Sequence, residues 1–167
     1  MVARKERGGR KLDVHDRALG LLAVRARSRS ELERRLTSAG FERDEITESL
    51  DRLTAVGLVD DEAFARAFAE HAVGTRGEGK RAVESALYAK GVSRETIELV
   101  VFQVTEERGD ESDRALALAR SRVRRLAGSE PAAAYRKLFS FLARRGYPPS
   151  VSREAARLAL EIDETVA

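Results

Sequence analysis

The chain has 167 residues and a formal net charge of +3, and 35% of its residues are charged whereas only 5% are aromatic. It contains no cysteine and only two histidines, which excludes disulfides and thiolate sites and leaves too few ligands for a histidine-based metal centre. Its apolar runs fall far short of the ~20 residues that span a bilayer, and its basic N-terminus lacks the apolar segment of a secretory signal. We therefore expect a cytoplasmic, helix-rich protein with a core of Leu, Val and Ala.

Three helices are predicted in the first third of the chain, because apolar residues recur at helical spacing and no stretch alternates as a strand does. A helix near 13–26 is followed by a second helix that begins with a capping-box pattern, Ser28 and Glu31. The second helix ends at Gly40, since glycine readily adopts the left-handed conformation that closes a helix. The third helix ends at Gly57.

Two adjacent carboxylates, Asp60 and Asp61, follow that last glycine and precede an apolar stripe with Phe64 and Phe68. Paired carboxylates can serve acid–base catalysis, but neighbours along a helix cannot both face one site, and no histidine or third carboxylate stands at useful spacing. Aspartate at an N-cap accepts a backbone N–H and favours the positive end of the helix dipole. We therefore expect one of the aspartates to cap the next helix, the two phenylalanines to pack on its buried face, and no catalytic, cofactor or metal site.

The same succession of helices recurs twice more along the chain. A helix near 60–75 is followed by a glycine-rich break, TRGEGK, and by a helix that stops at Gly91. The last round has a helix near 110–127, a middle helix that ends at Gly146, and a final helix that starts near Pro148. The glycine-rich break lacks both the spacing G-x-x-x-x-G-K-[ST] and the preceding strand of a phosphate-binding loop. A sharp turn between helices is the favoured interpretation.

An internal repeat is the strongest structural signal, because the segments LTSAGFERDEI, LYAKGVSRETI and LARRGYPPSV align. Their glycines, Gly40, Gly91 and Gly146, are 51 and 55 residues apart. Such a period is longer than that of a 34-residue helical-pair repeat, and each unit is expected to bury one face against its neighbours. The sequence predicts an all-α fold of three tandem three-helix, helix-turn-helix-like repeats in an elongated, curved array. The predicted boundaries are a flexible basic tail at 1–12 and repeats at 13–59, 60–108 and 109–163.

Two motifs carry a family resemblance. They read Glu31-Leu32-x-x-x-Leu36-x-x-x-Gly40 and Gly57-Leu58-Val59-Asp60-Asp61-x-x-Phe64-Ala65. Both resemble the RecX family of bacterial recombinase regulators, and the segment 79–97 is similar to the family's second-repeat pattern G-x-x-x-L-x-x-x-L-x-x-K-G-I. The likeness covers roughly residues 13–160. Two departures, Ala86 in place of a common glutamate and Lys80 in place of a frequent proline, are surface or helix-start changes.

The resemblance implies three tandem three-helix units that bind the RecA recombinase, typically within the groove of its filament on single-stranded DNA. There, members of the family inhibit ATP hydrolysis, strand exchange and co-protease activity, which connects them with DNA repair, homologous recombination and the SOS response. We accordingly expect a monomeric regulator that is not an enzyme, has no cofactor or small-molecule substrate, and does not bind membranes.

Basic residues are concentrated in the last third of the chain. From Arg114 to Arg157 there are eleven basic residues and only two acidic ones, which suggests a surface for a polyanion or an acidic protein, although solvated arginine-rich helices would give the same count. The predicted contact residues of the third repeat are Arg120, Arg122, Arg124, Arg125, Arg136, Lys137, Arg144 and Arg145. Among them, Arg120 and Arg124 are one helical turn apart and are expected to project together. A second candidate patch, offset by nearby acidic residues, comprises Arg25, Arg27, Arg34 and Arg35.

Two other functions remain open from the sequence. The three-helix units resemble helix-turn-helix modules, so the chain could be a stand-alone nucleic-acid-binding protein whose affinity falls steeply with salt. It could also be a structural adaptor on which the basic surface has no binding role.

Overall fold

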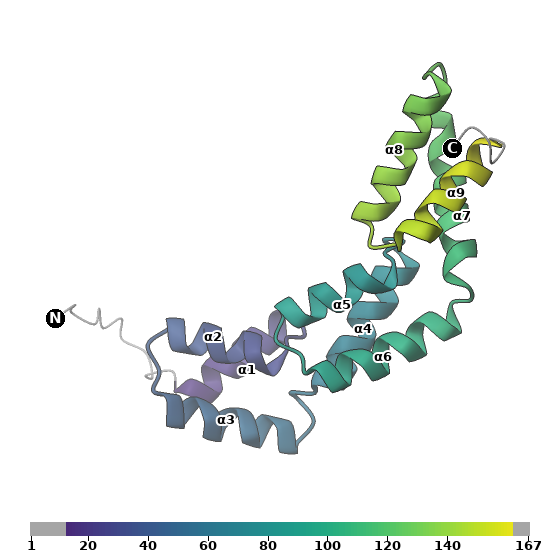
Figure 1. Cartoon of the computed structure of the whole chain (residues 1–167). Coiled ribbons are helices and arrows are strands. Elements are labelled where there is room, and N and C mark those ends of the chain that lie inside the picture. Colours follow the sequence, from purple (N-terminus) through teal and green to yellow (C-terminus); the bar gives the residue numbers. More distant parts are fainter. Residues whose placement is uncertain (1–12, 162–167) are drawn as a thin grey trace. The chain divides into compact units, whose positions relative to one another are not determined.

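The computed structural model describes residues 13–161, and in that part of the chain every regular element is a helix (Figure 1). The elements are α1 (Val14–Val24), α2 (Arg29–Ser38), α3 (Arg43–Ala55), α4 (Asp61–Gly74), α5 (Lys80–Ala89), α6 (Arg94–Glu107), α7 (Glu111–Val123), the 3₁₀ turn η1 (Arg124–Leu126), α8 (Pro131–Arg144) and α9 (Pro149–Leu160). The predicted basic tail, 1–12, and the end of the third predicted repeat, 162–163, lie outside the described residues. None of the described helices is both long enough and apolar enough to cross a membrane.

The chain divides into two compact units, Met1–Asp61 and Glu62–Ala167. In the first unit α1, α2 and α3 surround a core in which Leu32, Leu36 and Leu50 are fully buried. The Ser28 hydroxyl accepts the backbone N–H of Glu31 at 3.1 Å, which caps α2 as the sequence pattern predicted. Leucines one turn apart on α2 thus face inward while the opposite face stays solvated, as expected of an amphipathic helix.

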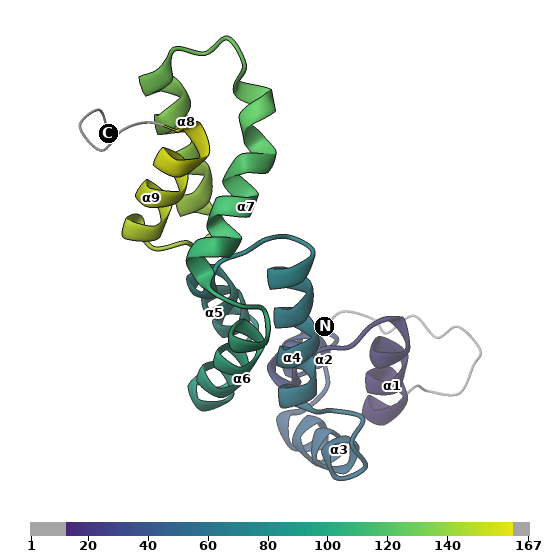
Figure 2. The ribbon, with the colours of Figure 1, turned by 90° about the vertical axis from the view of Figure 1, so that its right-hand side faces the viewer.

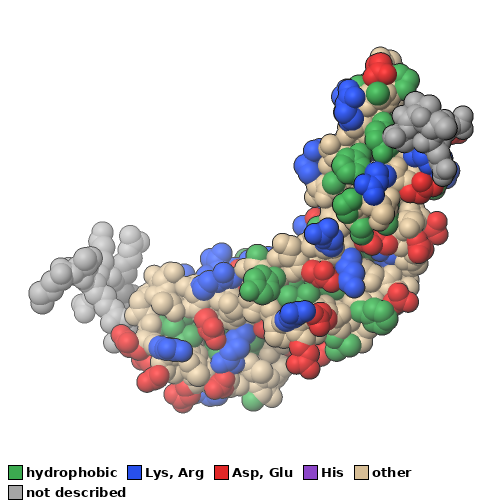
Figure 3. Space-filling model, viewed as in Figure 1, with side chains coloured by type: hydrophobic (Ala, Val, Ile, Leu, Met, Phe, Trp, Pro, Cys, Tyr) green, Lys and Arg blue, Asp and Glu red, His purple; other side chains and the backbone are tan. Residues whose placement is uncertain are grey.

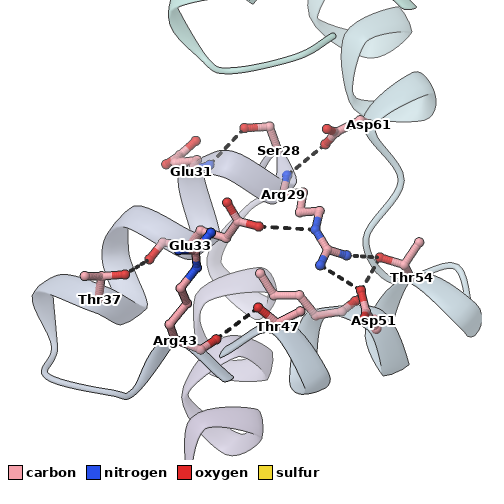
Figure 4. Close-up of polar contacts among 11 residues, drawn as sticks. Ser28, Arg29, Glu31, Glu33, Thr37, Arg43, Thr47, Asp51, Thr54 and Asp61 are labelled. Carbon is pink, nitrogen blue, oxygen red and sulfur yellow. Dashed lines mark hydrogen bonds and ion pairs between the residues drawn. The ribbon is translucent and has the colours of Figure 1, made fainter. Parts of the chain in front are cut away.

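The carboxylate of Asp61 also helps to begin α2, although the two are far apart in sequence. It accepts the backbone N–H of Arg29, the first residue of α2, at 2.8 Å (Figure 4). This N–H is one of those that a helix leaves without an internal partner. The prediction that Asp60 or Asp61 caps the helix that begins beside them, α4, stays a prediction, and this bond of Asp61 is an additional contact with α2. The aspartate is therefore a tertiary contact as well as part of a helix start.

Replacing Asp61 by alanine is expected to lower the free energy of unfolding of the first unit by about 0.5–2 kcal/mol, the usual loss for a helix N-terminal acceptor. The measurement is urea unfolding followed by far-ultraviolet circular dichroism. Glu48→Ala is the matched control, because Glu48 forms only an exposed pair with Arg52 on α3, and its loss should stay within about 0.5 kcal/mol. Equal losses for the two variants would show that the bond to Arg29 does not contribute.

The second unit contains two three-helix groups, each with its own core. In the group α4–α6 the fully buried residues include Val83, Leu87 and Val104, and Phe64 and Phe68 pack against this core while partly exposed. In the group α7–α9 the long helix α7 lies against α9, and α8 packs on α9 (Figure 2). The predicted helix-ending glycines of the two units have positive φ: Gly40 (87°), Gly57 (72°), Gly91 (77°) and Gly146 (86°).

The two groups of the second unit meet at a pair of glycines. The backbone N–H of Gly79 donates to the carbonyl of Arg145 at 2.7 Å. A Cβ on Gly79 would lie 2.8 Å from the Gly146 backbone, and a Cβ on Gly146 would lie 2.4 Å from the Ala82 nitrogen. Such distances leave no room for a side chain, so the backbones of the two groups touch directly.

Side chains around these glycines complete the joint. Burial raises the pKa of the Tyr147 phenol, which stays protonated and donates to the Gly77 carbonyl at 3.3 Å. The Glu111 carboxylate accepts the N–H of Lys80, the first residue of α5, at 3.0 Å, repeating the bond that Asp61 makes in the first unit. The glycine-rich segment after α4 is thus a docking turn, with Gly77 at φ 62°, in agreement with the sharp turn favoured from the sequence.

Candidate functional site

A basic groove of about 590 Å³ lies between α7, η1 and α8. Its cationic side chains are Arg122, Arg125, Arg136, Lys137 and Arg144. Figure 3 shows basic side chains over the α8 part of the molecule, in the upper part of the view. The groove is therefore the place where the structure brings together most of the cations that sequence analysis predicted for the third repeat.

The amphipathic pattern of α8 places these cations at the surface. Ala134, Leu138 and Leu142, one turn apart, are buried in the core of the α7–α9 group. The helix begins at Pro131, and the Glu130 carboxylate caps it by accepting two backbone N–H groups at 3.0 and 3.1 Å. Since residues one turn apart share a face, two neighbouring rows of α8 outside the buried stripe line the groove. They are Arg136–Ser140–Arg144 and Ala133–Lys137–Phe141.

The charge of the groove is not neutralised within the part of the chain that the structure describes. No acidic residue lines it, and none of its five cations forms an ion pair with a described carboxylate. Among the described residues, the Lys137 ammonium donates only to the Ser129 hydroxyl, at 3.4 Å. Uncompensated like charges in a concave surface attract anions from solution.

The ring of Phe141, in this groove, contacts two arginine side chains. The guanidinium carbon of Arg122 lies 4.2 Å from the centre of that ring, and that of Arg145 lies 5.3 Å away. Both distances are within the range of a cation–π interaction. Phe141 was not among the predicted contact residues, although it stands four residues from both Lys137 on α8 and Arg145 at the end of that helix.

The other predicted cations of the third repeat lie elsewhere. Arg120 and Arg124 are exposed but do not line the groove. Arg120 belongs to α7, which ends at Val123, and Arg124 belongs to the 3₁₀ turn that follows. Arg145 is half-buried, and its guanidinium donates to the carbonyl of Arg76 in the joint. Arg145 therefore belongs mainly to the contact between the two groups.

The second candidate patch is largely an internal ion-pair cluster. Arg25, Arg27 and Arg35 all donate to the carboxylate of Glu31, and only Arg34 of this set is simply exposed. Arg27 is only 7% exposed and also donates to the carbonyl of Leu21 at 3.2 Å. Arg27 was expected to be a surface contact, but in the structure its guanidinium binds the Glu31 carboxylate and the Leu21 carbonyl within the first unit.

The predicted structural carboxylates do not assemble into a larger cluster. Asp60 and Asp61 line a shallow pocket of about 290 Å³ together with Arg29 and Thr54. Within residues 13–161, no group of three or more His, Asp or Glu side chains is placed to hold a metal ion. His15 of α1 forms a hydrogen bond between its Nδ1 and the Ser49 hydroxyl of α3, at 3.2 Å.

Comparisons with known proteins identify the three-helix groups. Family models for the first, second and third three-helix domains of RecX match residues 15–53, 60–101 and 110–155. The regulatory protein RecX of Mycobacterium avium is 41% identical over 146 residues, which cover 86% of this chain and 83% of the relative. That of Corynebacterium efficiens is 39% identical over 160 residues, which cover 94% of this chain and 76% of the relative.

Solved structures show the same fold. The crystal structure of RecX from Lactobacillus salivarius matches with a TM-score of 0.75 at 20% identity, over 89% of this chain and 96% of that one. A second crystal structure, of a regulatory protein RecX, matches with a TM-score of 0.71 at 23% identity, over 83% of this chain and 67% of that one. The predicted all-α fold of three-helix repeats and the predicted family are confirmed: the chain belongs to the RecX family of regulatory proteins.

Proposed function

We propose that this chain is a non-catalytic regulator that binds the RecA recombinase and its filament on single-stranded DNA. In this proposal it inhibits ATP hydrolysis, strand exchange and co-protease activity, and acts as a monomer in DNA repair, homologous recombination and the SOS response. The observation that carries the proposal is the run of three consecutive matches to RecX three-helix domains. Chromosomal DNA and its recombinase lie in the bacterial cytoplasm, so the proposal places the chain there as well.

The repeated architecture supports binding to a repeated partner. Three similar helical groups can each contact one subunit, and a filament presents the same subunit surface many times. Once one group has bound, the others meet their sites at high effective concentration, so weak single contacts add to a firm attachment. The basic groove of the third group supplies a further, charged contact with the nucleoprotein filament.

The proposal is tested by adding the full-length chain to RecA, single-stranded DNA and ATP, and by following ATP hydrolysis and strand exchange. We expect both activities to fall at amounts of the chain below or equal to those of RecA, since one bound molecule affects several filament subunits. Hydrolysis by RecA without DNA serves as the control, because no filament is then present to be inhibited. Unchanged hydrolysis and strand exchange at stoichiometric amounts would overturn the proposal.

A second candidate, a stand-alone nucleic-acid-binding protein, is favoured by the basic groove on a three-helix group. This alternative predicts tight binding to bare DNA, with an affinity that falls steeply as salt rises, and no effect on RecA beyond competition for DNA. Raising the DNA concentration separates the two, because competition is then relieved whereas inhibition through the filament persists.

A further inference from the structure

We propose that the basic groove between α7, η1 and α8 binds the phosphate backbone of single-stranded nucleic acid directly, and that Phe141 holds Arg122 in position for this contact. The inference rests on the proposed function and deepens it, because it names the component of the nucleoprotein filament that the third group touches. The partner is the strand, and the alternative partner, an acidic protein surface, becomes an outcome of the test.

The charge and size of the groove fit several phosphates of one strand. Five cations line it, and no acidic residue of the described part of the chain does, so a single small anion would leave most of the charge uncompensated. Its volume of about 590 Å³ is that of a site for a small organic molecule, which corresponds to a few nucleotides rather than a duplex. Arginine and lysine contacts to phosphate are the usual source of sequence-independent affinity for nucleic acid.

None of the large apolar side chains that line the groove is fully exposed, unlike the anchors on which protein partners normally bind. Protein interfaces are centred on exposed aromatic and aliphatic anchors. In the groove Leu138 is 1% exposed, and the Phe141 ring is accompanied by Arg122. The large exposed apolar side chains of the second unit are Tyr88, Leu99, Phe102 and Leu158, on α5, α6 and α9. A polyanion is therefore the better match for the groove.

Phe141 is a positioning residue in this scheme. The guanidinium of Arg122 lies over its ring at 4.2 Å, which restricts a side chain that otherwise loses considerable rotamer entropy on binding. A guanidinium held in place presents its planar set of donors to a phosphate at a lower entropic cost. Replacing the ring should therefore weaken binding without removing any charge.

The test measures binding of the full-length chain to a fluorescently labelled oligo-dT by anisotropy, over a range of salt concentrations. The double variant Arg136→Ala/Arg144→Ala is expected to weaken binding on the order of tenfold. It should also lower the slope of log affinity against log salt by about 1.4, since each lost contact to a single strand removes about 0.7. The matched control is Arg81→Ala/Arg153→Ala, which removes two exposed arginines of the same unit outside the groove and should change affinity less than twofold.

Phe141→Leu provides the second arm. Leucine keeps an apolar side chain against the core of the α7–α9 group but cannot hold a guanidinium over a ring. We expect the affinity for oligo-dT to fall several-fold while the salt slope stays that of the unsubstituted chain, because the number of cations is unchanged. A thermal melt of the same samples checks that the fold is retained, and unchanged affinity in a folded Phe141→Leu chain would refute the positioning role.

The outcomes separate this inference from the proposed function. If the groove variant and its matched control lost the same affinity for oligo-dT, the groove would not be the binding site. Affinity would then depend only on the total positive charge of the chain. If the groove variant bound oligo-dT normally but no longer inhibited RecA, the groove would contact protein and the inference would be wrong while the function stood. If the unsubstituted chain bound oligo-dT through the groove yet left RecA unaffected, the inference would stand and the proposed function would fail.

Discussion

Gly146→Ala is expected to lower the free energy of unfolding of the second unit by about 2–5 kcal/mol. Gly146 has φ 86°, a left-handed conformation that costs a residue with a Cβ about 1–2 kcal/mol. Its Cβ would also lie 2.4 Å from the nitrogen and 2.5 Å from the Cβ of Ala82 on α5. Relieving such overlap by shifting backbone typically costs about 1–3 kcal/mol more. Urea unfolding measures the total loss of stability. Hydrogen–deuterium exchange of the segments 75–89 and 131–147 tests whether the destabilised backbone lies at the joint.

Gly40→Ala is the matched control for this substitution. Gly40 occupies the corresponding position of the first repeat and has φ 87°, but a Cβ there would meet no atom within 4 Å. Its replacement should therefore cost only the conformational part, about 1–2 kcal/mol. If the two variants lost the same stability, the close approach of Gly146 to α5 would make no energetic contribution, and the glycine joint would be only a turn.

Local sequence patterns predicted where these helices end but not what their terminal glycines contact. The repeated Leu-x-x-x-Gly register predicted that Gly40, Gly91 and Gly146 end helices, and helix ends follow from local backbone preferences. It did not show that Gly146 touches α5 while Gly40 faces open space. That difference arises from packing between residues more than 60 positions apart, Gly146 and Ala82, which no local pattern contains.

The partners of the charged side chains were also beyond what the sequence could predict. Capping preferences assigned Asp60 or Asp61 to the helix that begins beside them and gave no sign that the Asp61 carboxylate accepts the N–H of Arg29 on α2. Charge counting placed Arg27 on the surface, whereas Glu31 and the Leu21 carbonyl hold it inside. In each case residue type gave the correct chemistry, an acceptor for a helix start and a cation for a carboxylate, but the partner depended on tertiary structure.

The sequence predicted the basic character of the candidate groove but not which residues line it. The excess of basic residues after Arg114 indicated the third group. The pairing of Arg120 with Arg124 assumed that one helix continues through both, and α7 ends between them. The 3₁₀ turn that follows brings Arg125 into the groove with Arg122 and leaves Arg124 outside.

Glu31→Ala is expected to lower the free energy of unfolding of the first unit by about 3–5 kcal/mol. Arg27 is 7% exposed, and the Glu31 carboxylate is its ionic partner. Removing one member of a buried pair leaves the other charge without compensation, which is far more costly than losing an exposed pair. The matched control is Glu33→Ala, because Glu33 pairs with Arg29 at a more exposed place on the same helix, and its loss should be at most about 1 kcal/mol.

The same carboxylate should make the first unit sensitive to acid. Burial raises the pKa of Glu31, but the hydrogen bonds and charges of Arg25 and Arg27 outweigh it, so the pKa lies below its ordinary value of 4.5. A pKa that is lower in the folded than in the unfolded state gives stability that is complete above the unfolded value and is lost as pH falls through the folded one. In Glu31→Gln this loss below pH 4.5 should be smaller than in the unsubstituted chain, as measured by urea unfolding at pH 7 and at several acidic values.

A second substitution separates the pair from the rest of the cluster. Replacing the buried cation together with its partner, in Arg27→Met/Glu31→Ala, removes the uncompensated charge and leaves an apolar side chain in its place. We expect the double variant to be more stable than Glu31→Ala alone, because a buried pair can often be exchanged for apolar packing at little cost. If the double variant were instead destabilised by the sum of the single effects, the two residues would act independently. The stability of the first unit would then depend on the exposed contacts of Arg25 and Arg35, and not on the buried pair.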